Sequence, residues 1–389
     1  MKLIVDKDIP LAGSAFGALG NVELVDAAAL TRAGLRDTDA LIVRSTARVD
    51  AQLLDGSRVK FVGTATIGTD HVDTEYLASR GIAFASAPGS NANSVKEYVV
   101  AALLDIAVRR SWSLKGASIG IVGVGHVGSI VRNAAEALGM RVLLNDPPLA
   151  RQTGDRRFVP LDELMDAEVI TLHVPLTKGG PDATFHLFDE KRFDRMKRGS
   201  IIINTSRGSV VKGDALRNAA AGKQLGGSVV DVWENEPGID AALLANVTIG
   251  TPHIAGYSVE GKLNALRMIR KALCVHFGID DDWRPVPDAA KRELEVPPGM
   301  MTAESVLHYI VSRSYDIALD DKMLRGIADR PPQERGEYFT KLRSGYRERH
   351  EFAGTAVRLP EKHGHLAGAI AALGFNIKQV MSNREKIIQ

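Results

Sequence analysis

Three short polar blocks in the second half of the chain hold an arginine, a glutamate and a histidine. Arg207 stands in NTSRG, Glu236 in DVWENEP and His253 in TPHIAGY, and each block follows a short apolar run. An arginine can fix a carboxylate through two parallel hydrogen bonds. A histidine can take a hydroxyl proton near neutral pH, and a carboxylate beside it can hold one tautomer and favour the protonated ring. Together these residue types suit the oxidation of a 2-hydroxy acid, which also needs a hydride acceptor.

A glycine-rich turn earlier in the chain predicts that hydride acceptor. Residues 119–122 form an apolar run rich in β-branched side chains, typical of a strand buried on both faces. The sequence GVGHVG follows, and apolar residues then recur with the spacing of a helix. The first glycine would make a tight turn, the second would let the backbone approach a pyrophosphate, and the third would let the helix pack closely on the strand. The helix start would offer N–H groups to phosphate. We therefore expect a dinucleotide to bind at Gly123, Gly125, His126, Val127 and Gly128.

An acidic residue after the next apolar run indicates which dinucleotide is bound. Asp146 follows the run at residues 142–144 and lies eighteen positions after Gly128. A carboxylate at that place can accept hydrogen bonds from both hydroxyls of the adenosine ribose. It would repel a 2′-phosphate. The sequence therefore favours NAD over NADP.

Each of these features has an ordinary explanation when it is taken alone. The glycine-rich turn is compatible with any strand-to-helix connection. Arg207 could be a surface residue at a helix start, Glu236 a solvated loop acid and His253 a capped histidine in the core. Their order behind a nucleotide-binding turn favours a shared function instead.

Composition restricts the classes of partner. The chain has 389 residues, of which 45% are hydrophobic and 25% charged, as in globular proteins of two or three domains. The net charge of +2 gives no electrostatic case for binding nucleic acid or a membrane, although a local basic cluster would still suit a phosphorylated small molecule. The opening MKLIVDKDIP lacks the apolar core of a secretory signal, and the single cysteine, Cys274, cannot form an internal disulfide. We expect a cytoplasmic protein.

The first ninety residues predict a separate α/β unit. Short apolar runs alternate there with helical patterns, which is the rhythm of a parallel sheet. Arg44 and Ser45 follow the third run, and Thr66 follows the fourth. Ligands of open α/β sheets bind beyond the carboxyl ends of the strands. These residues are therefore candidates to face a substrate, with ordinary surface turns as the alternative.

Two long helical patterns suggest how the domains are connected. The pattern at residues 91–110 leads into the nucleotide-binding unit, and the pattern at 259–277 is long enough to cross back to the first unit. We expect a substrate domain formed by residues 1–92 and 258–284, with a nucleotide-binding domain at residues 93–257 inserted in it.

The last hundred residues differ in character. A proline-rich linker at Pro285, Pro287, Pro297 and Pro298 precedes them. Helical patterns at residues 304–315 and 365–373, a charged region to Glu351 and apolar runs at 355–359 and 375–380 then predict a small α+β domain. We place this C-terminal domain at residues 285–389. A domain of this size buries a modest core, so it is suited to docking on another chain.

The four blocks GIVGVGHVG, NTSRG, DVWENEP and TPHIAGY resemble the NAD-dependent D-2-hydroxyacid dehydrogenases over about residues 1 to 280. The resemblance implies a Rossmann NAD-binding domain inserted into a flavodoxin-like substrate domain. It also implies that Arg207 binds the substrate, that His253 is the proton donor or acceptor and that Glu236 supports it. NAD is the expected cofactor, with no metal.

Further blocks, including KLIVDKDIP, VRST, FVGTATIGTDHVD, APGSNA and HIAGYSVEGK, resemble one branch of this family, which oxidises a phosphorylated four-carbon hydroxy acid. That branch forms homodimers through an extra C-terminal domain. The closer resemblance implies that Ser45, Thr66 and Tyr257 contact the substrate. It implies that the cofactor is lined by Asp146, Val174, Thr205, Ser206, Arg207, Asp231 and Gly256. Arg44 is our candidate for the substrate phosphate, and a surface salt bridge is the alternative.

Two other functions remain open from the sequence. A phosphoglycerate dehydrogenase would share the arginine, glutamate and histidine, but a regulatory amino-acid-binding domain would be expected after residue 285. An NADH-sensing corepressor can retain the same three residues without catalysis. A stable peptide complex that depends on NADH would favour the corepressor.

Overall fold

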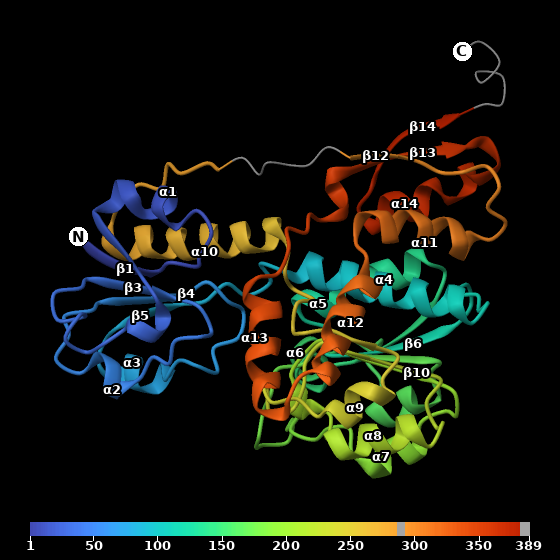
Figure 1. Ribbon diagram of the computed structural model, residues 1–389, viewed down its shortest axis with the longest axis horizontal. Coiled ribbons are helices and arrows are strands. Elements are labelled where there is room, and N and C mark those ends of the chain that lie inside the picture. The colour runs from blue at the N-terminus through green and yellow to red at the C-terminus, as the bar shows by residue number, and fades with distance from the viewer. Residues whose placement is uncertain (286–291, 382–389) are drawn as a thin grey trace. The chain divides into compact units, whose positions relative to one another are not determined.

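The computed structural model describes residues 1–285 and 292–381. The chain divides into two compact units, the first comprising Met1–Ala92 and Ser258–Asp288 and the second Asn93–Tyr257 and Ala289–Gln389 (Figure 1). Among the described residues, the first unit contains one parallel sheet and the second contains two. Pro287 of the expected linker lies outside the described residues. No helix in the described part of the chain is long and apolar enough to span a membrane.

The first unit has a five-stranded parallel sheet with the order β2-β1-β3-β4-β5. This is the strand order of flavodoxin-like folds. Its strands are β1 Lys2–Asp6, β2 Asn21–Val25, β3 Ala40–Val43, β4 Phe61–Thr64 and β5 Ala83–Ala85. Its helices are α1 Ala12–Phe16, α2 Ala51–Leu54, α3 Thr74–Ser79 and α10 Val259–Phe277.

Helix α10 joins this sheet from far along the sequence. Ser258 caps its start by accepting a hydrogen bond from the Gly261 N–H at 2.8 Å. A Cβ at Gly63 of β4 would lie 2.5 Å from Ile269, so the glycine lets α10 lie directly on the sheet. The return of the chain after residue 257 therefore completes the core of the first unit.

The second unit has a six-stranded parallel sheet with the order β11-β10-β9-β8-β6-β7. Its strands are β6 Ser118–Val122, β7 Arg141–Asn145, β8 Val169–Leu172, β9 Ile201–Asn204, β10 Gly227–Val230 and β11 Ile249–Gly250. Its helices are α4 Ala92–Arg109, α5 His126–Ala137, α6 Pro147–Thr153, α7 Glu190–Arg195, α8 Gly213–Ala221 and α9 Ala241–Asn246. The winding direction reverses between β6 and β8, and such a reversal opens a crevice at the carboxyl ends of the strands.

The C-terminal segment packs on the same core as the NAD-binding fold. It contributes a three-stranded parallel sheet in the order β12-β13-β14. Its elements are β12 Arg292–Glu295, α11 Ala303–Ser314, α12 Ile317–Arg325, α13 Arg335–Ser344, β13 Thr355–Pro360, α14 Ala367–Leu373 and β14 Asn376–Met381. One continuous apolar cluster joins α4 and β6 to α11, β13 and α14. Helix α4 is consequently buried along most of its length.

Helices α12 and α13 occupy the region that the sequence shows only as charged. Lysine, arginine and glutamate are good helix formers, but a helix is read from sequence mainly by its apolar stripe. In α13 the only described side chain that is buried is Phe339. The apolar pattern of this helix is therefore too weak to see in the sequence.

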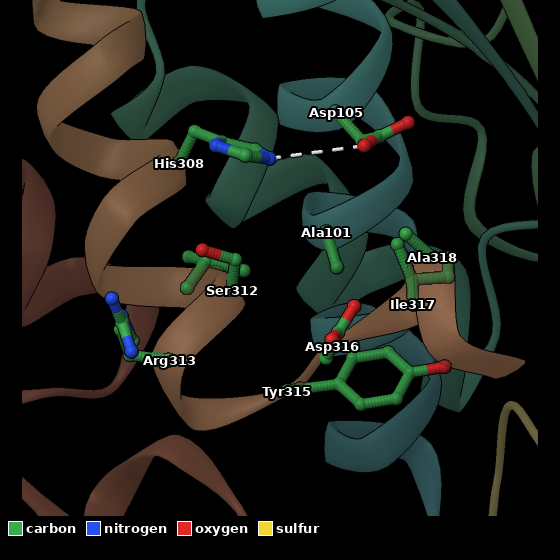
Figure 2. A pocket seen from close by; sticks show the side chains of 10 residues that line it. Ala101, Asp105, His308, Ser312, Arg313, Tyr315, Asp316, Ile317 and Ala318 are labelled. Atoms are coloured by element: carbon green, nitrogen blue, oxygen red, sulfur yellow. Dashed lines mark ion pairs between the residues drawn. The ribbon is translucent and has the colours of Figure 1, made fainter.

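A cavity of about 350 Å³ lies where α11 and α12 meet α4. Figure 2 shows its lining, with His308 of α11 facing Asp105 of α4 at 3.7 Å between Nε2 and Oδ1. None of the residues that line this cavity was predicted to contact substrate or cofactor.

Candidate active site

The glycine-rich turn between β6 and α5 has the geometry of a pyrophosphate cradle. Gly123 has a φ of +86°, and a Cβ there would lie 2.6 Å from the His173 carbonyl oxygen. A Cβ at Gly128 would lie 2.0 Å from the Gly123 carbonyl oxygen, so α5 can start this close to the turn only with glycine. Gly125 is exposed, and no atom lies within 4 Å of its Cβ position. No side chain caps the start of α5. Open space and uncapped N–H groups therefore meet at one point, and they fit a dinucleotide.

Asp146 braces this turn from the end of β7. Its Oδ2 accepts a hydrogen bond from the Val124 N–H at 2.8 Å, and its Oδ1 accepts one from the Leu149 N–H at 3.0 Å, which caps α6. A carboxylate oxygen has a second lone pair. The partly exposed carboxylate can therefore still accept hydrogen bonds from ribose hydroxyls while it holds the turn.

The loops after β8 and β9 meet beside the glycine-rich turn. The Val174 side chain lies 2.7 Å from the Cβ position of Gly123. His173 hydrogen-bonds to Thr171 through Nε2 at 3.0 Å and to Thr205 through Nδ1 at 3.3 Å. Burial lowers the pKa of His173 to about 3. The His173 ring is therefore neutral, and its hydrogen bonds connect the loop after β8 to the loop after β9. Val174 and Thr205, which belong to these loops, lie at the same edge of the sheet.

His253 and Glu236 form a direct pair. The His253 Nδ1 lies 2.7 Å from Glu236 Oε2, and Glu236 Oε1 accepts a hydrogen bond from the Trp233 N–H at 2.8 Å. Burial raises the pKa of Glu236, but the hydrogen bond and charge of His253, the hydrogen bond from Trp233 and the charge of Arg343 outweigh it, and the pKa is lowered overall. The side chains of His253 and Glu236 remain 28% and 20% exposed. Glu236 is thus a carboxylate anion, and the imidazole of His253 remains partly accessible to solvent.

The backbone of the His253 loop is held by a buried carboxylate. Asp231 accepts hydrogen bonds from the N–H groups of Ile254 at 2.8 Å and Ala255 at 2.9 Å. His253 itself has a φ of +59°, which is unfavourable for a residue with a side chain. Strain of this kind persists only where the surroundings fix it, and it concentrates at functional sites. The contacts of Asp231 therefore hold the backbone of the His253 loop, and a contact between Asp231 and the cofactor stays a prediction.

A chain of hydroxyls extends from Asp231 into α4. The Thr251 hydroxyl donates to Asp231 at 2.7 Å, and its oxygen lies 2.7 Å from the Tyr98 hydroxyl. Because the single proton of the threonine goes to the carboxylate, the tyrosine must donate to Thr251. Tyr98 is fully buried, so α4 supports the His253 loop from the core.

Arg207 stands in a loop that Asn204 organises. The Asn204 amide donates to the Arg207 carbonyl oxygen at 3.0 Å, and its oxygen accepts from the Ser206 N–H and hydroxyl. A Cβ at Gly208 would lie 2.0 Å from the backbone of Trp233. The Arg207 loop therefore rests directly on the loop of Glu236. Ser206 is buried and bound to Asn204, so its proposed contact with the cofactor stays a prediction.

The candidate substrate residues of the first unit lie at the carboxyl ends of neighbouring strands. Ser45 is exposed after β3, and Thr66 follows β4, where its hydroxyl donates to the Gly68 carbonyl oxygen at 2.9 Å. Arg44 is already paired: its Nε lies 3.0 Å from Asp6 Oδ2, and its Nη2 lies 2.6 Å from Asp8 Oδ2. The two carboxylates neutralise the charge that a phosphate would need.

Curated proteins match the chain over nearly its whole length. Erythronate-4-phosphate dehydrogenase of Salinibacter ruber is 44% identical over 380 residues, which cover 93% of this chain and 96% of that protein. The enzyme of the same name from Escherichia coli O1:K1 is 42% identical and covers 97% of this chain and 98% of its own. This chain belongs to the erythronate-4-phosphate dehydrogenase family. The family model described as "D-isomer specific 2-hydroxyacid dehydrogenase, NAD binding domain" matches residues 89–255.

Solved structures place this family member among NAD-dependent dehydrogenases. NAD-dependent formate dehydrogenase of Staphylococcus aureus in complex with NAD has a TM-score of 0.60 at 26% identity, over 72% of this chain and 98% of its own. D-lactate dehydrogenase of Aquifex aeolicus, complexed with NAD and lactic acid, has a TM-score of 0.59 at 27% identity, over 72% of this chain and 96% of its own. The expected α/β fold with a Rossmann domain, the expected NAD cofactor and the expected enzyme class are confirmed.

Sequence reasoning missed several residues that shape this site. His173 is adjacent to the predicted Val174, and a histidine at the end of an apolar strand was a signal that could have found it. Tyr98 and Arg343 offered none, because their neighbours lie far away in the sequence. Within the described residues, no group of three or more histidine, cysteine or acidic side chains could hold a metal ion.

Proposed function

We propose that this chain oxidises 4-phospho-D-erythronate at C2 to (R)-3-hydroxy-2-oxo-4-phosphobutanoate. The observation that carries this proposal is the 2.7 Å contact between His253 Nδ1 and Glu236 Oε2, with the Glu236 loop resting on the loop of Arg207. The choice of substrate is supported by full-length relatives named for this reaction. The reaction is a step in making pyridoxal phosphate, and we infer that the protein serves that pathway in the cytoplasm.

In the proposed mechanism each protein group has one task. Arg207 clamps the substrate carboxylate and so orients C2. The Nδ1 of His253 is engaged by Glu236, so its Nε2 takes the C2 hydroxyl proton as the carbonyl forms. Glu236 stabilises the imidazolium that results. When bound, NAD accepts the hydride that leaves C2.

The remaining site assignments belong to the same proposal. Ser45, Thr66 and Tyr257 would contact the substrate. The cofactor would be lined by the glycine-rich turn, Asp146, Val174, the loop from Thr205 to Arg207, Asp231 and Gly256. The substrate domain would comprise residues 1–92 and 258–284, and the NAD-binding domain residues 93–257.

We also infer a homodimer formed through the C-terminal domain at residues 285–389. The support is the resemblance stated above, together with apolar side chains that remain exposed in this part of the chain. Met301 is 87% exposed and Met323 is 44% exposed. Light scattering on the purified full-length chain should give twice the mass of one chain, and the mass of a single chain at all concentrations would contradict the inference.

Parallel turnover of two phosphorylated acids tests the proposed function. Purified protein would be given NAD with 4-phospho-D-erythronate or 3-phospho-D-glycerate, and a 2-oxo acid would be added to regenerate bound cofactor. Selective oxidation of erythronate phosphate is the expected result. A preference for phosphoglycerate would keep the mechanism and overturn the substrate. No turnover, together with tight binding of NADH, would favour a corepressor.

A further inference from the structure

Helix α13 places an arginine beside the candidate active site. The guanidinium carbon of Arg343 lies 5.9 Å from the centroid of the Tyr257 ring. Its charge is also among the influences that lower the pKa of Glu236. Nearer the start of the helix, the Cβ position of Gly336 lies 3.6 Å from the Pro237 side chain. Helix α13 therefore runs along the Glu236 loop and ends at Tyr257.

Arg343 differs from the arginines that follow it, because no hydrogen bond or ion pair to its guanidinium is found among the described residues. Arg347 pairs with the Asp320 carboxylate. Arg349 donates to the carbonyl oxygens of Ser94 at 2.7 Å and Ala255 at 3.3 Å. The Nε of Arg343 is buried and makes no hydrogen bond, and no ion pair to its guanidinium is found within residues 1–285 and 292–381.

An ordinary structural role accounts for part of this arrangement. Arg343 stands in the last turn of α13, where a cation interacts favourably with the helix dipole, and it lies over an aromatic ring. Neither contact satisfies a buried guanidinium N–H, and a buried donor without an acceptor is unfavourable. The guanidinium of Arg343 therefore keeps N–H donors that an anionic ligand can satisfy.

We propose that Arg343 binds the phosphate of the substrate and that the C-terminal segment thereby selects phosphorylated hydroxy acids. This proposal rests on the proposed function. The substrate carries two anionic groups, and Arg207 takes only the carboxylate. A guanidinium fork matches phosphate oxygens in geometry and charge. Arg44, the other candidate for the phosphate, is held by two aspartates.

The test compares substrates with and without the phosphate. Arg343→Ala and Arg343→Gln would be assayed with saturating NAD on 4-phospho-D-erythronate and on D-erythronate. Lys341→Ala is the matched control, because Lys341 is 73% exposed on the same helix and pairs only with Glu337 among the described residues. We expect kcat/KM for the phosphorylated acid to fall about 10- to 100-fold, mainly through KM, as for loss of a charged hydrogen bond. The value for D-erythronate should fall much less than that for the phosphorylated acid, and Arg343→Lys should recover part of the loss.

Equal losses for both substrates would overturn the proposal, because a structural role or a contact with the carboxylate would reduce both. Wild-type kinetics in both variants would overturn it as well. A second measurement separates this failure from a failure of the proposed function. If the wild-type chain does not oxidise erythronate phosphate, calorimetry with inorganic phosphate still decides the question. Weaker binding in Arg343→Gln than in Lys341→Ala supports the phosphate site, and equal binding rules it out.

Discussion

Replacing Glu236 by glutamine would test the support of His253 with a change of one atom. Glu236 accepts hydrogen bonds from two donors, the Trp233 N–H and the His253 Nδ1–H. Glutamine offers one acceptor and one donor. If its oxygen faces Trp233, its NH₂ faces Nδ1, and the ring proton must move to Nε2. His253 could then no longer accept the hydroxyl proton. If the amide is reversed, two donors face each other at Trp233.

The lost charge sets the magnitude of the effect. The two charges are centred about 4 Å apart, and at an effective dielectric constant of about 20 their attraction amounts to about 4 kcal/mol. Because both side chains are partly exposed, we expect the lost stabilisation to be somewhat less than this value. The corresponding fall in kcat is about 10² to 10³. NADH binding should not change, because Glu236 acts on the transferred proton.

The assay is kcat for oxidation of 4-phospho-D-erythronate, with NADH affinity measured by fluorescence. Glu234→Gln is the matched control, because it makes the same change in the same loop, where Glu234 binds His186 at 2.7 Å and the Gly213 N–H at 2.8 Å. The control should keep a rate close to that of the wild type. A Glu236→Gln enzyme within about tenfold of the wild-type kcat would refute the role of this pair.

Three further predictions follow from the same geometry. His253→Ala should lower kcat by about 10² to 10⁴ and keep NADH affinity, so near-normal turnover would exclude His253 as the base. Gly128→Ala should destabilise the fold, because the new Cβ would lie 2.0 Å from the Gly123 carbonyl oxygen. Gly125→Ala should fold normally and bind NADH weakly, because its Cβ position is open. Thermal unfolding and NADH titration would give the same results for both variants if the turn had no such role. The pKa of His173 is about 3 when folded and about 6.5 when unfolded, so the unfolded chain binds the proton first as pH falls. The contribution of neutral His173 to the free energy of unfolding is fully present above pH ~6.5, and this free energy should fall by about 1.4 kcal/mol per pH unit below that pH. Denaturant titrations at neutral and acidic pH should show a shallower fall in His173→Asn. An equal fall in the variant and the wild type would contradict the assignment.

The sequence was most informative where structure depends on local chemistry. The run at residues 40–43 and the helical pattern at 259–277 coincide with β3 and α10, because β-branched runs and helical spacing carry their own signal. The glycine-rich turn was equally legible. Gly123 and Gly128 have steric reasons to be glycine, and Gly125 leaves the space in front of the turn open.

Features that depend on distant parts of the chain were not predictable. Strand β12 pairs with β13, more than fifty residues away, and its own sequence, RELE, is mostly charged. Arg343 lies in the segment that sequence patterns show only as charged, and its position near Tyr257 and Glu236 depends on how α13 packs. The roles of the individual site residues, the domain boundaries and the homodimer stay predictions.

Transfer of deuterium tests the central claim most directly. The wild-type chain would be given NAD and 4-phospho-D-erythronate carrying deuterium at C2, and the NADH formed would be analysed by mass spectrometry. One deuterium in each NADH molecule is the expected result, and formation of labelled NADH should be lost in His253→Ala. NADH without deuterium, or labelled NADH formed as fast by His253→Ala as by the wild type, would contradict it.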